Sequence, residues 1–124
     1  MAHPHQVGPT LKFEGMIGYA VAEAEEAEHF FEHTLGLPPG VDDGALRLYQ
    51  LSDDLTLVVD VTGAMNGAPP YMIFSAPNIT EAAEHFLQRG CQVGELPWAS
   101  GNGFVAKSAE GHVVCIVDAA AFED

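Results

Sequence analysis

The chain has 124 residues, of which 18 are acidic and four are basic, and its formal net charge at pH 7 is −14. A charge of this sign and size repels nucleic acid and anionic membranes, so neither is expected as a partner. No apolar run reaches the roughly 18 residues of a membrane span, and no secretory leader is recognisable. The two cysteines lack metal-ligand spacing, which favours reduced thiols in a cytoplasmic protein. The acidity itself indicates either solubility and salt adaptation or attraction of cationic ligands.

The first half of the chain begins with a tail, a strand and an amphipathic helix. Residues 1–11 are polar and are expected to form a flexible tail, and a strand is predicted over residues 13–21. From Glu23 to Leu35, at about 100° per residue, the apolar and aromatic residues share one arc, and Gly36 follows where a left-handed C-cap is expected. The solvent-facing arc of this helix is predicted to hold Glu25, Glu26, His29, Glu32 and His33.

Three strands are predicted after this helix. A short piece lies near residues 39–41, an alternating strand spans residues 45–51, and an aliphatic strand over residues 55–60 ends in Asp60. A polar turn joins the last two strands into a hairpin. Residues 63–70, which are rich in glycine and proline, are expected to be a linker.

The second half of the chain repeats the first. The dipeptide Met-Ile at Met16 recurs 56 residues later at Met72, and the run Ala-Glu-His-Phe that ends at Phe30 recurs at the same distance, ending at Phe86. An internal period of this kind indicates one supersecondary unit used twice. A functional site is therefore expected to be shared between two related halves.

The elements of the second half follow the same order. A capping box from Asn78 to Glu81 opens its helix, Gly90 closes it, and its last strand ends in Asp118 as the first half ends in Asp60. Its strands are predicted over residues 71–76, 91–96, 103–107 and 113–118. The predicted modules are residues 12–62 and residues 71–120, within a single domain of residues 12–124.

One run of residues resembles a known superfamily. Ala27-Glu28-His29-Phe30-Phe31 followed by Leu35-Gly36-Leu37, within two βαβββ units, resembles the vicinal oxygen chelate superfamily of glyoxalase I, extradiol dioxygenases, and fosfomycin and bleomycin resistance proteins. The similarity extends from Phe13 to Asp118, although the final turn keeps only Gly111 of the superfamily pattern. It implies an α+β fold in which two tandem βαβββ modules form a curved mixed sheet around a cavity. It also implies a homodimer with the linker as a crossover.

The resemblance places four residues at the superfamily's metal-ligand positions. Metal-dependent members carry His or Gln on the first strand of each module and Glu on the last, and this chain has Met16, Thr56, Tyr71 and Cys115 there. A hard divalent cation prefers carboxylate and imidazole ligands, which these residues do not supply. We therefore expect no metal and no cofactor.

Two local features, an H-x-x-E-H motif and Cys115, are compatible with a catalytic role, but each has a simpler structural interpretation. The run from His29 to His33 matches H-x-x-E-H, the inverted zinc-protease motif. Its aromatic pair lies on the apolar arc of the helix, so surface histidines are favoured over a zinc site, which needs a cleft and a third ligand. Cys115 lies in an apolar strand, where packing is favoured over a nucleophilic role.

Strand alternation predicts which side chains line the cavity that the resemblance implies. If the ligand positions point inward, Glu14 and Asp60 also point inward and add negative charge. Aromatic walls are expected from further residues, with ordinary core packing as the alternative for Trp98 and Phe104. The expected ligand-binding set is Glu14, Met16, Tyr49, Thr56, Asp60, Tyr71, Trp98, Phe104 and Cys115.

Two functions follow from this set. The first is a metal-free binding protein, similar to the bleomycin resistance branch, that sequesters a small aromatic and cationic molecule in an antibiotic-resistance role. The second is a lyase, isomerase or dioxygenase-type enzyme, either metal-free with Asp60 or Glu14 as general base or metal-dependent through other ligands. Binding is favoured, because the sequence shows no pairing of a base with oxyanion donors.

Overall fold

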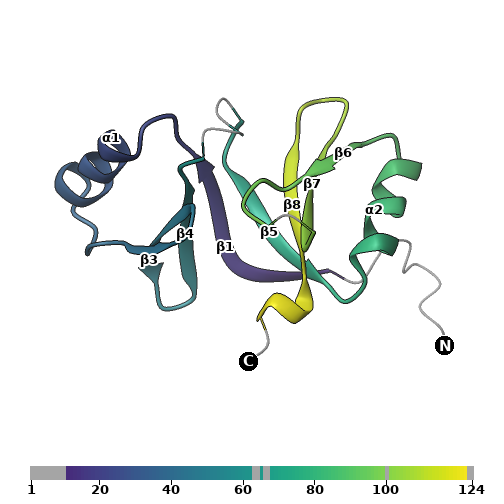
Figure 1. Ribbon diagram of the computed structural model, residues 1–124, viewed down its shortest axis with the longest axis horizontal. Helices are drawn as coiled ribbons and strands as arrows, with labels where there is room; N and C mark the ends of the chain where they lie inside the picture. Colours follow the sequence, from purple (N-terminus) through teal and green to yellow (C-terminus); the bar gives the residue numbers. More distant parts are fainter. Residues whose placement is uncertain (1–10, 63–64, 66–67, 100, 123–124) are drawn as a thin grey trace. The chain divides into compact units, whose positions relative to one another are not determined.

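The computed structural model describes residues 11–62, 65, 68–99 and 101–122, and in them each half of the chain shows strand, helix and three strands (Figure 1). The α+β class and the repeated βαβββ order are thus confirmed. Two compact units are present, one comprising Gly15–Ile73 and the other the chain before and after it. The expected tail, apart from Leu11, and part of the expected linker over residues 63–70 lie outside the described residues.

The unit Gly15–Ile73 has the strand order β2-β3-β4-β1. Its strands are β1 (Lys12–Ala20), β2 (Val41–Asp43), β3 (Leu46–Ser52) and β4 (Leu55–Asp60). β1 runs parallel to β4, with Met16 opposite Thr56 and Ala20 opposite Asp60, whereas β3 runs antiparallel to β4. The sheet is therefore mixed. The helix carries the chain back to the end of the sheet where β1 began, so a later strand can run parallel to β1, whereas the hairpins make the other pairs antiparallel.

The helix of this unit changes type along its length. It begins as α1 (Ala24–Glu28) and continues as a π-helix, η1 (His29–Thr34), in which the N–H of Leu35 bonds the carbonyl of Phe30 at 2.7 Å. A bond over five residues widens the turn relative to an α-helix. The regular spacing assumed for the sequence is therefore wrong here, and Glu32, predicted to face solvent, faces the sheet with its side chain only 13% exposed.

The core of this unit lies between the helix and one face of the sheet. Phe31 of η1 packs there with side chains of β3 and β4, and residues of β1 complete the cluster at its edges. The buried members of this core are Phe31, Tyr49, Leu57 and Val59. Because neighbouring residues of a strand point to opposite faces, the residues between them face away from the helix.

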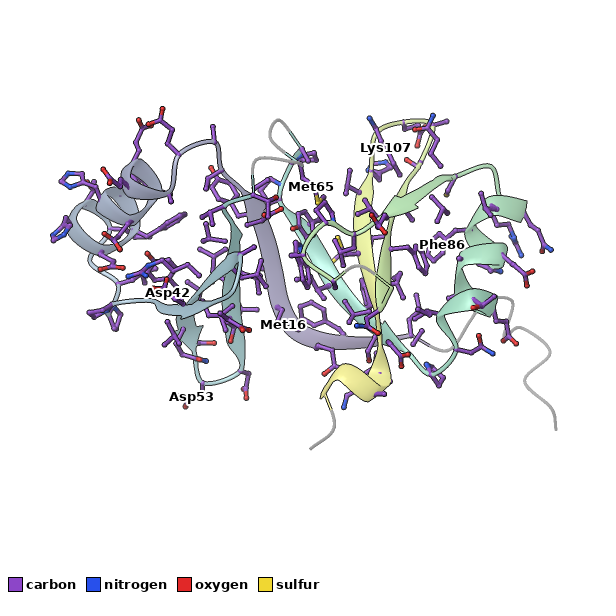
Figure 2. All side chains as sticks on the ribbon, in the orientation of Figure 1. Met16, Asp42, Asp53, Met65, Phe86 and Lys107 are labelled. Carbon is purple, nitrogen blue, oxygen red and sulfur yellow. The ribbon has the colours of Figure 1, made fainter. Side chains whose placement is uncertain are left out.

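The second unit has the strand order β5-β8-β7-β6 and the helix α2 (Ile79–Gln88). Its strands are β5 (Tyr71–Ala76), β6 (Gln92–Glu95), β7 (Gly103–Lys107) and β8 (Val113–Asp118), and a 3₁₀ turn, η2 (Ala119–Phe122), follows them. The first three residues of β5, which include Tyr71, still belong to the unit Gly15–Ile73. The core forms between α2 and the sheet, where the ring centroids of Phe86 and Phe104 are 5.8 Å apart. Phe86 is labelled on α2 in Figure 2.

The predicted helix ends are present in both halves. Asn78 Oδ1 accepts a hydrogen bond of 3.0 Å from the N–H of Glu81 and so caps α2. Gly36 and Gly90 have φ angles of 87° and 86°, which glycine adopts without a steric penalty. No helix within the described residues is both long and apolar enough to cross a membrane.

Candidate functional site

The candidate site lies on the sheet face of the unit Gly15–Ile73 that points away from its helix. Leu57 and Val59 of β4 belong to the helix-side core, so Thr56, Val58 and Asp60 point to the other face. The residues paired with them on β1 are Met16, Gly18 and Ala20. We call the surface formed by these six residues the Asp60 face.

Tyr71 covers the middle of the Asp60 face. A Cβ atom added to Gly18 would lie only 2.0 Å from Cε1 of Tyr71, so the ring sits directly against the glycine backbone. Tyr71 is 2% exposed, and Val58, the partner of Gly18 on β4, is also buried. The face therefore combines an aromatic ring and aliphatic surface with the carboxyl group of Asp60 at its end.

Asp60 is fully buried, and only one of its two carboxyl oxygens has a hydrogen-bond donor among the described residues. Its Oδ1 accepts a hydrogen bond of 2.8 Å from the N–H of Thr62, two residues on. Its Oδ2 is shielded from solvent, and among the described residues none donates a hydrogen bond to it. A buried acceptor without a partner costs about 1–3 kcal/mol, so its presence in a folded protein calls for a physical reason.

Asp118, the equivalent of Asp60 in the second half, shows which part of the role of Asp60 is structural. Asp118 also ends a strand, and its Oδ1 accepts a hydrogen bond of 2.9 Å from the N–H of Ala120, again two residues on. This local turn is a common use of aspartate and explains one oxygen in each copy. Asp118 is only half-buried, whereas Asp60 is fully buried. The fold therefore does not account for the unpartnered oxygen of Asp60.

A divalent metal does not fit the residues at the superfamily's ligand positions. Met16 and Thr56 face each other across β1 and β4 and offer a thioether and a hydroxyl, and Tyr71 offers a phenol. Hard cations bind such groups poorly. Within the described part of the chain, no three or more His, Cys, Asp or Glu side chains gather as a metal site would require.

Four predicted site residues, Glu14, Trp98, Phe104 and Cys115, belong to the other unit. Glu14 accepts a hydrogen bond from the hydroxyl of Ser75, and Trp98 is half-buried in the turn after β6. Cys115 is buried on β8 opposite Val105 and, like the half-buried Cys91, forms no disulfide. None of these residues is among the six that form the Asp60 face.

Two of the expected cavity residues are core residues instead. Tyr49 lies opposite Leu57 and packs against Phe31, with ring centroids 5.4 Å apart, so it points to the helix side. Phe104 lies opposite Ile116 in the helix-side core of the other unit, where it meets α2. The expectation that Tyr49 and Phe104 line a cavity is therefore wrong, because their strand positions have the parity that faces the helices.

A charged cluster under η1 was not expected from the sequence. Arg47 contacts the carboxylates of Glu28 at 2.9 Å, Glu32 at 2.8 Å and Asp42 at 2.5 Å, and Asp42 is marked in Figure 2. The hydroxyl of Tyr49 also donates to Glu32 at 2.8 Å. The hydrogen bond from Arg47, followed by those from the backbone of Gly40 and from Tyr49, lowers the pKa of Glu32 to about 2. This cluster fastens the helix to β3.

The glutamate of the H-x-x-E-H motif, Glu32, is part of this charged cluster. His29 and His33 are exposed, and their rings lie 5.3 Å apart. Glu32, which lies between them in sequence, faces the sheet and accepts a hydrogen bond from Arg47. A zinc protease needs this glutamate to activate water at the metal. The motif therefore serves the packing of the helix.

Comparison with known proteins shows the fold. No family model matches the sequence, and no curated protein matches it either. A structure described as NAD-dependent benzaldehyde dehydrogenase from Legionella pneumophila has a TM-score of 0.60 at 12% identity, over 83% of this chain and 96% of that one. A hypothetical protein from Bacillus halodurans has a TM-score of 0.58 at 14% identity, over 88% of this chain and 94% of that one.

A mutant of homoprotocatechuate 2,3-dioxygenase from Brevibacterium fuscum has a TM-score of 0.59 at 14% identity. The similarity covers 90% of this chain and only 33% of the dioxygenase. At such identities, structural likeness shows the fold and not the chemistry. This chain therefore shares its fold with these proteins, and the extradiol dioxygenase among them is of a class that the sequence resemblance named.

Proposed function

We propose that this protein is a metal-free, small-molecule binding protein of the glyoxalase and bleomycin resistance type, and that it holds a small aromatic cation on the Asp60 face. The observation that carries the proposal is the buried Oδ2 of Asp60, which lacks a partner among the described residues. A cationic donor on a ligand would supply that partner. Charge-assisted hydrogen bonds to carboxylates are about twice as strong as neutral ones.

The neighbours of Asp60 favour a ligand with an apolar, flat body. Val58 and the ring of Tyr71 are buried on the same face, and Met16 adds a polarizable thioether. Ligand sites are usually apolar surfaces with a few polar groups that fix the orientation. An aromatic ring on these side chains, with its cationic group at Asp60, satisfies both requirements.

The charges of the unit favour binding of a cation over acid–base catalysis. Arg47 is the only lysine or arginine between Gly15 and Ile73, and it lies on the helix side among three carboxylates. An enzyme that used Asp60 as general base would need a group to stabilise the negative charge that develops on its substrate. The Asp60 face offers no cationic side chain for that purpose among the described residues, whereas a cationic ligand needs none.

The ligand chemistry can be tested with matched compounds. Benzamidinium and benzamide have similar shape, and only the first is cationic. We expect millimolar benzamidinium, and a bleomycin-type glycopeptide at lower concentration, to raise the melting temperature of the protein by several degrees, with benzamide giving less than half that shift. The shift should shrink as salt rises from 50 to 500 mM, because charge pairs are screened. Equal shifts from both compounds, or no shift from either, would refute the proposal.

A further inference from the structure

A hollow lies on the helix side of the unit Gly15–Ile73. It has a volume of about 580 Å³ and opens between the end of β1 and the α1–η1 helix. We call it the aromatic hollow. The lining residues that matter here are Tyr19, Glu23, Glu26, Phe30 and Phe31. Its volume falls within the range of small-molecule sites.

Two aromatic rings of the hollow, those of Tyr19 and Phe30, each pack edge-on against the ring of Phe31. Phe31 is buried, and the rings of Tyr19 and Phe30 stand on it at centroid distances of 5.8 and 5.4 Å, with interplanar angles of 82° and 78°. Both rings are therefore nearly perpendicular to Phe31. Tyr19 remains 37% exposed and Phe30 51% exposed. Their π-faces are thus available to a ligand that enters the hollow.

The π-helical turn explains how Phe30 reaches this position. Its carbonyl accepts the hydrogen bond from Leu35, so both adjacent phenylalanines lie within the widened turn. Phe30 and Phe31 then both line the hollow, although neighbours on an α-helix diverge by about 100°. π-Helical turns are rare and occur often at functional sites. The large Phe30 side chain stays half-exposed, although its burial would be favourable.

The charge of the lining selects the ligand class. Glu23 and Glu26 contribute carboxylates, His29 lies beside them, and no lysine or arginine lines the hollow among the described residues. Aromatic π-faces and carboxylates both attract cations, and together they are the usual means of binding alkylated ammonium groups. An anion would meet the two carboxylates and no lysine or arginine among the described lining residues.

We infer that the aromatic hollow binds an alkylated ammonium ion, with the cationic head between Tyr19 and Phe30 and near Glu26. The side chain of Tyr19 belongs to the opposite face of β1 from Gly18, so the hollow and the Asp60 face differ in location, and Ala20 at the end of β1 borders both. It also differs in its chemistry. The Asp60 face offers one buried carboxyl oxygen, whereas the hollow offers open π-faces with carboxylates at its rim.

The test is a titration of the full-length protein with choline and with its neutral analogue of equal shape, 3,3-dimethyl-1-butanol, followed by amide chemical shifts. We expect choline to shift the resonances of residues 19–34 in a saturable way at millimolar concentration, and the neutral analogue to bind at least fivefold more weakly. Equal affinity for the two compounds, or no saturable shift with choline up to 50 mM, would overturn the inference.

Variants separate cation–π binding from simple apolar contact. Phe30→Leu keeps an apolar side chain and lacks a π-face, and it should weaken choline binding at least fivefold. Leu87→Ala, which truncates a similarly exposed residue on α2, should leave binding unchanged. Circular dichroism should show that both variants remain folded. If Phe30→Leu binds choline as the natural protein does, the hollow is not a cation site.

Two further variants keep this inference separate from the proposed function. Glu26→Gln should weaken choline binding, whereas Glu84→Gln, an exposed substitution on α2, should not. Asp60→Asn should leave choline binding intact, since the Asp60 face is on the other side of the sheet. Loss of choline binding in Asp60→Asn with retention in Glu26→Gln would assign the ammonium ion to the Asp60 face and refute the hollow as its site.

Discussion

The ring of Tyr71 occupies the space that a side chain at position Gly18 would fill. An added Cβ would come within 2.0 Å of Cε1 and 2.2 Å of Cζ of that ring. Real Cβ atoms do not approach another atom so closely, so the glycine is required by packing and not by its backbone angle. This contact fixes the aromatic part of the Asp60 face.

Substitution of that glycine should therefore disturb both stability and binding. We expect Gly18→Ala to lower the free energy of unfolding by about 3 kcal/mol, because the Tyr71 ring must move within a packed interior. Gly94→Ala on β6 is the matched control, since an added Cβ there meets nothing within 4 Å, and it should change stability by less than about 1 kcal/mol. Urea unfolding measures both, and equal effects would contradict the packing role of Gly18.

The Glu32 cluster predicts a defined pH dependence. The pKa of Glu32 is lowered from 4.5 to about 2 in the folded state, so its contribution to stability is complete above pH 4.5 and is lost as the pH falls toward 2. Glu32→Gln should thus lower the urea midpoint at pH 7 and leave it nearly unchanged at pH 2. Glu84→Gln, an exposed control on α2, should show no such pH-dependent difference. A Glu32→Gln effect of equal size at both pH values would contradict this assignment.

The absence of superfamily ligands predicts weak metal binding. After chelation and reconstitution with nickel, manganese or zinc, elemental analysis should find less than one metal per chain, with no rise in melting temperature. His3→Ala combined with His5→Ala should remove most of the residual metal, because two histidines this close in sequence can bind a transition metal adventitiously. Stoichiometric metal that survives in this double variant would assign the protein to the metal-dependent branch.

The superfamily resemblance also predicts a homodimer, for which the residues 63–70 would supply the crossover. Light scattering at micromolar concentration should give twice the chain mass of 13.2 kDa. A mass equal to that of one chain would contradict the prediction. The measurement is independent of any ligand.

Much of the fold follows from local patterns that the sequence displays directly. The two halves, their helix caps at Gly36 and Gly90, and the aspartates that end the last strands were all predicted, because each depends on residues close in the chain. Periodicity and capping are local properties, so one sequence is sufficient to show them. The superfamily resemblance then gave the order in which these elements combine.

The side-chain directions were less predictable. Tyr49 and Phe104 were expected in a cavity, yet each faces a helix, because alternation shows which residues share a face and not which face a helix covers. Glu32 and Phe30 were misplaced for another reason. A π-helical turn rotates them relative to regular α-helical spacing, and nothing in the local sequence marks that turn. The aromatic hollow was missed as a result.

The central claim is that Oδ2 of Asp60 is the acceptor for a cationic ligand, and Asp118 provides the control. Asp60→Asn keeps the turn through Oδ1 and removes the charge, whereas Asp118→Asn makes the same change in the second copy. Without ligand, Asp60→Asn should be at least as stable as the natural protein, because it replaces a buried carboxylate, one oxygen of which has no partner among the described residues, by a neutral amide.

Calorimetric titration of benzamidinium into the three proteins tests this claim most directly. We expect Asp60→Asn to weaken binding by about 1–3 kcal/mol, the cost of losing a charged hydrogen-bond acceptor, and Asp118→Asn to bind as the natural protein does. Binding of equal strength in Asp60→Asn and the natural protein would contradict the account.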